Sequence, residues 1–147
     1  MPSVVAESLR PEESPGLLLW RVTLRWQRRI TATLKPFGLT HVQFVLLAST
    51  WWLARNDDRT PNQRDVAQHA VVDVMMASQV LRALEAKGLV RRERDPQDAR
   101  AVQVTITEAG AELAVRAVRA VEAADADFFA AAPDQAALVE ALRTLSE

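Results

Sequence analysis

The chain has 147 residues and a formal net charge of −1, and hydrophobic residues make up 49% of it, so it is long enough for one domain with a real core. It has no cysteine and only two histidines, which excludes disulfides, thiolate chemistry and a convincing metal site, and we expect neither metal nor cofactor. The longest apolar run, residues 44–54, is too short to span a bilayer and no signal peptide opens the chain, so we expect a cytoplasmic protein without a membrane partner.

The first 38 residues predict an arm followed by one long helix. Residues 1–13 show no periodicity and are expected to form a loose arm. Ser14 followed by Pro15 is typical of a helix start, and Pro36 with Gly38 predicts the end of the helix. One side of this helix is apolar and comprises Leu19, Val22, Trp26, Ile30 and Leu34.

Two more helices are predicted between residues 40 and 70. Thr40 is a good N-cap for a helix that runs to about Arg55. Thr60 precedes Pro61, and this pair predicts the cap and the first residue of a short third helix. The inward face of that helix is expected at Val66 and Ala67.

A fourth helix is predicted over residues 72–87, after a brief turn. Its apolar residues recur at helical spacing and are Val74, Ala77, Val80, Leu81 and Leu84. The outward face is expected to carry Met75, Met76, Gln79, Arg82, Ala83 and Ala86. Gly88 follows Lys87 at the place where a left-handed C-terminal cap is expected.

Beyond Gly88 the apolar period changes to two, which indicates strands over residues 89–94 and 102–106. The Asp- and Pro-containing segment 95–100 predicts the turn between them. Two short helices followed by a hairpin with a basic tip are typical of a winged helix-turn-helix. One helix of such a unit can enter the DNA major groove while the hairpin reaches the backbone or minor groove, so DNA binding is the leading hypothesis.

Two C-terminal helices complete the predicted fold. Thr107 caps a helix that runs to Phe129, and Pro133 separates it from a last amphipathic helix. The terminal helices have more apolar surface than one small lobe can cover, which favours pairing with a second copy. We expect a single, mainly α domain with a small β-hairpin over residues 14–147, in which residues 14–38 and 107–147 form dimerisation helices around a winged-helix lobe at 39–106. The expected dimer residues are Leu17, Leu18, Phe128, Phe129, Leu138, Leu142 and Leu145.

Four segments carry a resemblance to a known family: LTHVQFVLL at 39–47, LEAKGLVRR at 84–92, Asp-Ala-Arg at 98–100 and TITEAG at 105–110. Together they resemble the multiple-antibiotic-resistance regulator (MarR) family of bacterial transcription factors, from about residue 17 to the end of the chain. The resemblance implies a homodimeric, ligand-responsive regulator, usually a repressor, that binds near-palindromic promoter DNA. Many members carry Ser, Thr and Arg where this chain has Met75, Met76 and Gln79, so base preference does not carry over.

By this resemblance, the helix at 72–87 enters the major groove. Gln79 suits a bidentate contact with adenine, Arg82 suits guanine or a phosphate, and Ser78 suits a base edge or the backbone. Met75 and Met76 would press on thymine methyl groups. The alternatives are that the methionines fill gaps in the core and that Gln79 and Arg82 form only a solvated face.

Arg100 is the leading candidate at the tip of the wing, where a guanidinium suits a narrow minor groove. Asp98 is expected either to hold that guanidinium or to brace the loop, and a plain surface ion pair is the alternative. The residues at the start of the third helix are expected to position phosphates or merely to cap the helix. The full set of expected DNA contacts is Thr60, Asn62, Gln63, Arg64, Met75, Met76, Ser78, Gln79, Arg82, Arg94, Asp98 and Arg100.

The charge distribution is uneven: residues 1–56 carry +4, residues 57–106 carry 0, and residues 107–147 carry −5. The acidic residues therefore lie away from the expected DNA face, and affinity for phosphates should be moderate and salt-sensitive. The neutral lobe favours one alternative, a winged-helix protein-interaction module without specific DNA binding. We do not expect an enzyme, because no nucleophile–base pair or phosphate-binding glycine loop is present.

All four tryptophans fall in the first two long helices. The family implies a small, often aromatic or anionic, effector bound between these helices and the DNA-binding lobe. Arg25 or Arg29 would pair with an anionic effector, and the alternative for the aromatic residues is plain core packing. The candidate pocket residues are Trp26, Arg29, His41, Phe44, Trp51 and Trp52.

Overall fold

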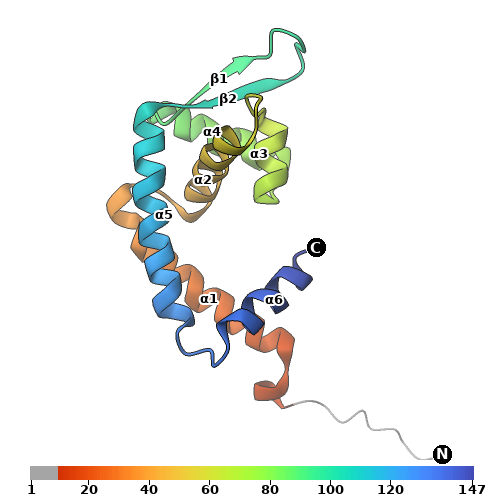
Figure 1. Ribbon diagram of the computed structural model, residues 1–147, viewed down its shortest axis with the longest axis vertical. Coiled ribbons are helices and arrows are strands. Elements are labelled where there is room, and N and C mark those ends of the chain that lie inside the picture. The colour runs from red at the N-terminus through yellow and green to blue at the C-terminus, as the bar shows by residue number, and fades with distance from the viewer. Residues whose placement is uncertain (1–9) are drawn as a thin grey trace, which may run out of the picture.

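The computed structural model describes residues 10–147, which form six α-helices, two short 3-10 helices and one two-stranded antiparallel sheet. The helix α5 runs along the long axis of the molecule (Figure 1). At one end it meets a lobe made of α2, α3, α4 and the hairpin, and at the other end it lies beside α1 and α6. The elements are η1 (Pro11–Glu13), α1 (Pro15–Leu34), η2 (Lys35–Phe37), α2 (His41–Asn56), α3 (Gln63–Ala70), α4 (Val74–Ala86), β1 (Val90–Arg94), β2 (Val102–Ile106), α5 (Glu108–Phe129) and α6 (Gln135–Leu145).

Helix caps explain most element boundaries and confirm the predicted fold class. The side-chain oxygens of Ser14, Thr40 and Thr107 accept hydrogen bonds from backbone N–H groups in the first turns of α1, α2 and α5. Gly38 and Gly88 adopt φ values of 67° and 74°, a region that glycine enters without steric cost and that ends a helix. The winged helix-turn-helix order predicted from the sequence is therefore present.

The predicted start of the third helix is wrong by two residues. Asn62, not Thr60, caps α3: its side chain accepts the Asp65 N–H at 2.9 Å, and Asp65 accepts the Asn62 N–H in return. Pro61 does not begin the helix because its carbonyl accepts the Val104 N–H at 2.8 Å. The segment before α3 is thereby held alongside β2, and an isolated bridge joins Asn62 to Gln103.

The segment expected to be a loose arm lies mostly outside the described residues, since the structure describes none of residues 1–9. Within its described part, Pro11–Glu13 form one 3-10 turn before α1. No single described helix is long and apolar enough to cross a membrane, and only Pro15–Phe37 and His41–Asn56 together, bent by 72°, reach that length and composition.

The core lies where α2, α3, α4 and α5 meet the hairpin and the C-terminal half of α1. Its largest buried side chains are Ile30, Leu34, Leu46, Leu47, Leu81, Leu84, Val66, Val90, Val104 and Thr50. Three residues predicted on inward faces are instead exposed, namely Leu19, Val22 and Val74. The first two lie on the half of α1 that extends beyond the lobe, and Val74 is in the first turn of α4.

The hairpin and α5 are joined by a close contact at Gly110. Thr107 donates its backbone N–H to the Leu89 carbonyl at 3.1 Å and its hydroxyl to the Gly88 carbonyl at 2.7 Å. A Cβ on Gly110 would lie 2.0 Å from the Leu89 oxygen. Only a glycine therefore allows α5 to begin this close to β1, which explains the glycine of the TITEAG segment.

Candidate nucleic-acid interface

The exposed face of α4 carries the residues predicted to contact bases. Asp73 caps the helix by accepting the Met76 N–H at 2.8 Å. Met75 is 76% exposed and Met76 43% exposed, so the alternative that they fill the core is wrong. Gln79 and Arg82 are exposed as well, and Ser78 is half-buried. Met75, Gln79 and Arg82 follow one another at spacings of four and three residues and so share one face of the helix.

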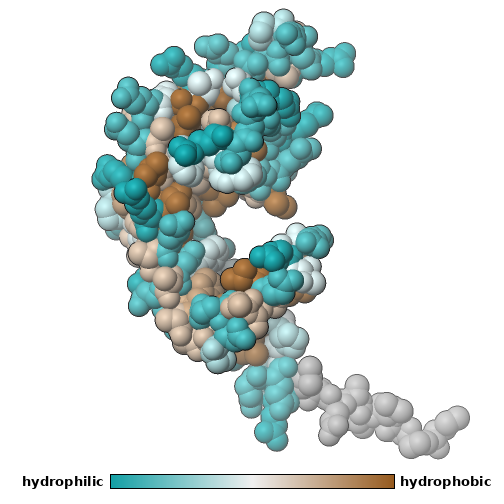
Figure 2. All heavy atoms as spheres, viewed as in Figure 1, coloured by the Kyte–Doolittle hydropathy of each residue, from teal (hydrophilic) through white to brown (hydrophobic). Residues whose placement is uncertain are grey.

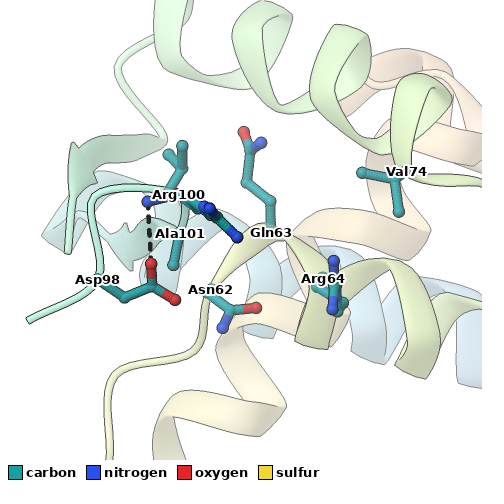
Figure 3. Close-up of a pocket in the computed structure, with 8 residues that line it drawn as sticks. Asn62, Gln63, Arg64, Val74, Asp98, Arg100 and Ala101 are labelled. Carbon is teal, nitrogen blue, oxygen red and sulfur yellow. Dashed lines mark hydrogen bonds between the residues drawn. The ribbon is translucent and has the colours of Figure 1, made fainter.

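A hollow of about 360 Å³ lies between the starts of α3 and α4 and the wing, which is the hairpin loop 95–101. Figure 3 shows the Arg100 side chain extending from the wing toward the start of α3, the helix that carries Arg64. The hollow is thus lined by two guanidinium groups, and such groups bind phosphate oxygens well. Its lining residues are Asn62, Gln63, Arg64, Val74, Asp98, Arg100, Ala101 and Val102.

The wing is braced by its own aspartates. Asp98 accepts the backbone N–H of Arg100 at 3.0 Å (Figure 3), and its carbonyl accepts the Ala101 N–H. Asp95 accepts the Gln97 N–H at 2.8 Å. Of the two roles left open for Asp98, the structure supports bracing of the loop, which presents Arg100 at a fixed place while its guanidinium extends toward the hollow.

One basic residue of the hairpin has a structural role that the sequence analysis missed. Arg92 donates its guanidinium and its backbone N–H to Glu85, at 3.3 Å and 2.9 Å, and a further N–H to Gln63 Oε1 at 3.0 Å. These bonds tie β1 to α4 and α3. The signal was available, because Arg92 is two residues from buried Val90 and so shares its inward face of the strand.

The remaining predicted contacts differ in position. Asn62 and Gln63 line the hollow but also serve the fold, as the cap of α3 and as the acceptor for Arg92. Thr60 lies in a separate recess beside Asp57, Asp58 and β2. Arg94 is exposed at the end of β1.

Trp26, His41 and Asp125 meet at the junction of α1, α2 and α5. The indole N–H of Trp26 donates to Asp125 Oδ1 at 2.7 Å, and the rings of Trp26 and His41 pack edge to face with centroids 5.1 Å apart. Burial lowers the pKa of His41 below its ordinary value of 6.5, and the negative charge of Asp125 partly offsets that effect.

The other predicted pocket residues do not gather around this junction. Arg29 pairs with Asp127 at 2.7 Å on the surface, and Phe44 packs against the core. Trp51 lies under the Arg55 guanidinium, whereas Trp52 stacks on His69 of α3. The six residues therefore do not line one cavity in the protomer, because adjacent positions such as Trp51 and Trp52 point about 100° apart around a helix.

A hollow of about 790 Å³ does lie beside His41, between α1 and the start of α2. Two cations that the sequence analysis did not select, Arg28 and Lys35, line it together with Leu24, Leu39 and Thr31. Their signal was the spacing of residues 24, 28, 31 and 35, which places them on one helical face. This hollow, rather than the tryptophans, combines positive charge with apolar surface.

The loss of protein stability at acidic pH should depend on His41. Because the pKa of His41 is lowered in the folded state, the unfolded chain binds a proton at this residue more readily than the folded chain does. The contribution of neutral His41 to the free energy of unfolding is therefore complete above pH 6.5 and is lost as the pH falls through the folded pKa. We expect His41→Gln to flatten this loss, measured as urea midpoints at about pH 7.5 and about pH 5.

Asp125→Asn provides the matched comparison, since it keeps an oxygen for the Trp26 indole but removes the charge that supports protonated His41. Its acid-induced loss of stability should exceed that of the parent protein. Parallel profiles for the parent and His41→Gln would mean that His41 does not control the loss of stability at acidic pH.

An apolar groove of about 520 Å³ lies between the N-terminal half of α1 and α6. Leu18, Phe129, Leu138 and Leu142, all predicted dimer residues, line it with Leu19, Val22, Thr23 and Trp26. Figure 2 shows tan and brown side chains at this end of the molecule, beside an open notch that separates α6 from the lobe. No residue of α6 is buried, and Leu145 is 81% exposed. The two remaining predicted dimer residues, Leu17 and Phe128, are half-buried and directly precede Leu18 and Phe129 in the sequence.

The fold and the cationic hollow define a winged helix-turn-helix protein. A sequence model described as the MarR family matches residues 39–102. The HTH-type transcriptional regulator YdcH of Bacillus subtilis is 42% identical over 135 residues, which cover 92% of this chain and 91% of YdcH. The repressor Rv2887 of Mycobacterium tuberculosis is 36% identical, covering 82% and 84%. The chain therefore belongs to the MarR family of transcriptional regulators.

Solved structures agree with this assignment. CouR from Rhodococcus jostii RHA1, bound to p-coumaroyl-CoA, superposes with a TM-score of 0.77 at 30% identity, covering 94% of this chain and 92% of CouR. CouR bound to a 23-mer DNA duplex gives a TM-score of 0.80 at 27% identity, covering 95% and 99%. These relatives are transcriptional regulators rather than enzymes.

Proposed function

We propose that this regulator is a homodimeric repressor of near-palindromic promoter DNA in the cytoplasm, released by a small aromatic or anionic effector. The observation that carries the proposal is the exposed face of α4 beside the cationic hollow of α3 and the wing. In this arrangement α4 enters the major groove while Arg100 reaches the adjacent minor groove and Arg64 a phosphate. The structure of CouR bound to a 23-mer DNA duplex supports DNA binding by this fold.

The apolar groove supports assembly of two copies. Leu142 is 45% and Leu18 40% exposed in the protomer, and large exposed apolar patches usually mark an interface. We place the dimerisation helices at residues 14–38 and 107–147 and the DNA-binding lobe at 39–106. A twofold dimer presents its two α4 helices to half-sites about one DNA turn apart, which is why a palindrome is expected.

The hollow beside His41 is the proposed effector site. Arg28 and Lys35 suit a carboxylate, while Leu24 and Leu39 suit an aromatic ring. Among the relatives, Rv2887 has been solved with salicylic acid and CouR with p-coumaroyl-CoA. Of the effector residues predicted from the sequence, His41 lines this hollow, and the Trp26 ring packs against the His41 ring.

A direct connection links this hollow to α4. Lys87, at the end of α4, donates to the Gly38 carbonyl at 2.5 Å and to Gln43 Oε1 at 3.0 Å. The turn that holds Gly38 also contributes Leu39 and Thr40 to the hollow. An effector that prefers another arrangement of this turn would shift α4 and release DNA through its differential affinity.

The test is fluorescence anisotropy with labelled DNA from upstream of this protein's own gene and a scrambled duplex of equal length, each at two salt concentrations. Tight, salt-dependent and sequence-selective binding is expected, followed by release with aromatic carboxylates. Equal and weak binding to both duplexes would contradict the proposal for this promoter and favour the protein-interaction alternative, for which the neutral charge of residues 57–106 is the motivation.

Arg100→Ala should weaken binding to all sequences by roughly tenfold and reduce the salt dependence, because it removes one guanidinium from each wing. The same anisotropy titrations measure both effects. Arg143→Ala is the matched control, since Arg143 is an exposed arginine of α6 that pairs with Glu140. Equal loss of affinity in both variants would show that only net charge matters.

A further inference from the structure

The first turn of the proposed recognition helix is apolar at its surface. Val74 is 52%, Met75 76% and Met76 43% exposed, although Met and Val are usually buried. Asp73 starts the helix at this turn, and the buried positions of α4 begin only with Ala77. Three neighbouring apolar side chains thus lie at the end of α4 that points to base edges in helix-turn-helix proteins.

Cations flank this apolar turn. Val74 lines the same hollow as Arg64 and Arg100, and Arg82 lies two turns further along the face that Met75 begins. Arg64 on one side and Arg82 on the other suit the two phosphate backbones that border a groove, whereas Val74, Met75 and Met76 between them are uncharged. The Asp73 carboxylate beside this turn is engaged as the helix cap, where it accepts the Met76 N–H. The charge pattern therefore places the methionines over the floor of the groove.

We infer that Met75 and Met76 recognise thymine through its C5-methyl group, the apolar feature that the major groove displays. The inference rests on the proposed DNA binding and deepens it by naming the base. A thioether side chain is flexible and polarisable, so it follows the methyl group closely without needing a hydrogen-bond partner. Gln79, one turn further on, supplies a polar contact with the next base pairs.

This recognition has a specific chemical signature. Uracil pairs with adenine as thymine does but lacks the methyl group, so replacing thymine by deoxyuridine at the contacted position removes only the apolar contact. Burial of one methyl group corresponds to about a fourfold change in affinity. Symmetrical replacement in both half-sites should weaken binding by about tenfold or more.

The experiment begins with selection of duplexes from a random library by the full-length protein. Each thymine of the selected site is then replaced in turn by deoxyuridine, symmetrically in both half-sites, and affinity is measured by anisotropy. The scan is repeated with Met75→Ala, with the double variant Met75→Ala/Met76→Ala and with Gln79→Ala. All three positions are exposed or partly exposed on one helix, so folding should be unaffected, and circular dichroism verifies this.

The expected result is at least one thymine per half-site whose replacement weakens binding in the parent and in Gln79→Ala, with the penalty lost in the double methionine variant. A selected site with a flat deoxyuridine scan overturns the inference while leaving the proposed DNA binding intact. A penalty that persists in the double variant overturns it as well, because other groups would then contact the methyl. Failure to select any sequence overturns both the inference and the proposed function.

Discussion

Replacing Leu142 with aspartate should produce a monomer and weaken operator binding by roughly 10²- to 10⁴-fold, because a dimer gains its affinity by engaging two half-sites at once. Leu142 lines the apolar groove between α1 and α6 and is 45% exposed in the protomer. A carboxylate there would be buried without a partner on dimerisation, and that cost opposes assembly. Light scattering measures the mass, and anisotropy measures the affinity.

Ala136→Asp is the control for this experiment, since it adds the same charge to an exposed position on the opposite side of α6. It should remain dimeric and bind DNA as the parent does. A Leu142→Asp protein that stays dimeric would exclude the α1–α6 groove as the main interface. A monomer with full affinity would mean that one copy suffices for the operator.

Gly110→Ala should destabilise the protein by about 3 kcal/mol, because the new methyl group overpacks a contact that cannot relax easily. The Cβ would lie 2.0 Å from the Leu89 carbonyl oxygen, which already accepts the Thr107 N–H. Relief requires α5 to move away from β1 and weakens that bond. Chemical denaturation at a fixed protein concentration gives the change in the free energy of unfolding.

Gly16→Ala makes the same chemical change in a helix where, among residues 10–147, nothing beyond the adjacent helix backbone lies within 4 Å of the new Cβ. It should be neutral or stabilising by up to about 1 kcal/mol, the ordinary gain in helix propensity. The contrast between the two variants isolates packing from propensity. If Gly110→Ala unfolds at the parent's midpoint, the contact between α5 and β1 is looser than the structure shows.

Local chemistry made much of this fold predictable. Ser14, Thr40 and Thr107 cap their helices through contacts three residues away, and Gly88 ends α4 by its own backbone preference. Such signals lie within a few residues of the element they define. The same holds for most of the outward face of α4, which follows from helical spacing, although Val74 in the first turn is exposed and Ala83 is half-buried.

Contacts between distant segments were not predictable in this way. The start of α3 depends on a hydrogen bond from Val104 to Pro61, so the favourable Thr60–Pro61 pair does not begin the helix. The residues predicted to line one effector pocket lie at different places for a similar reason. Trp26, for example, donates its indole N–H to Asp125, which is 99 residues away in the sequence. A sequence pattern identifies which side chains leave a helix on the same face but not what they meet.

The length of α5 sets a mechanical constraint on the whole regulator. Its 22 residues make a rod of about 33 Å that joins the α1–α6 end of the molecule to the hairpin. A tilt of roughly 6° at one end moves the other by about 3.4 Å, the distance between successive base pairs. A small rotation near the groove would therefore be amplified at the wing into a full step along DNA. In the proposed dimer, the angle of this single helix would determine which operator spacing the two lobes can span.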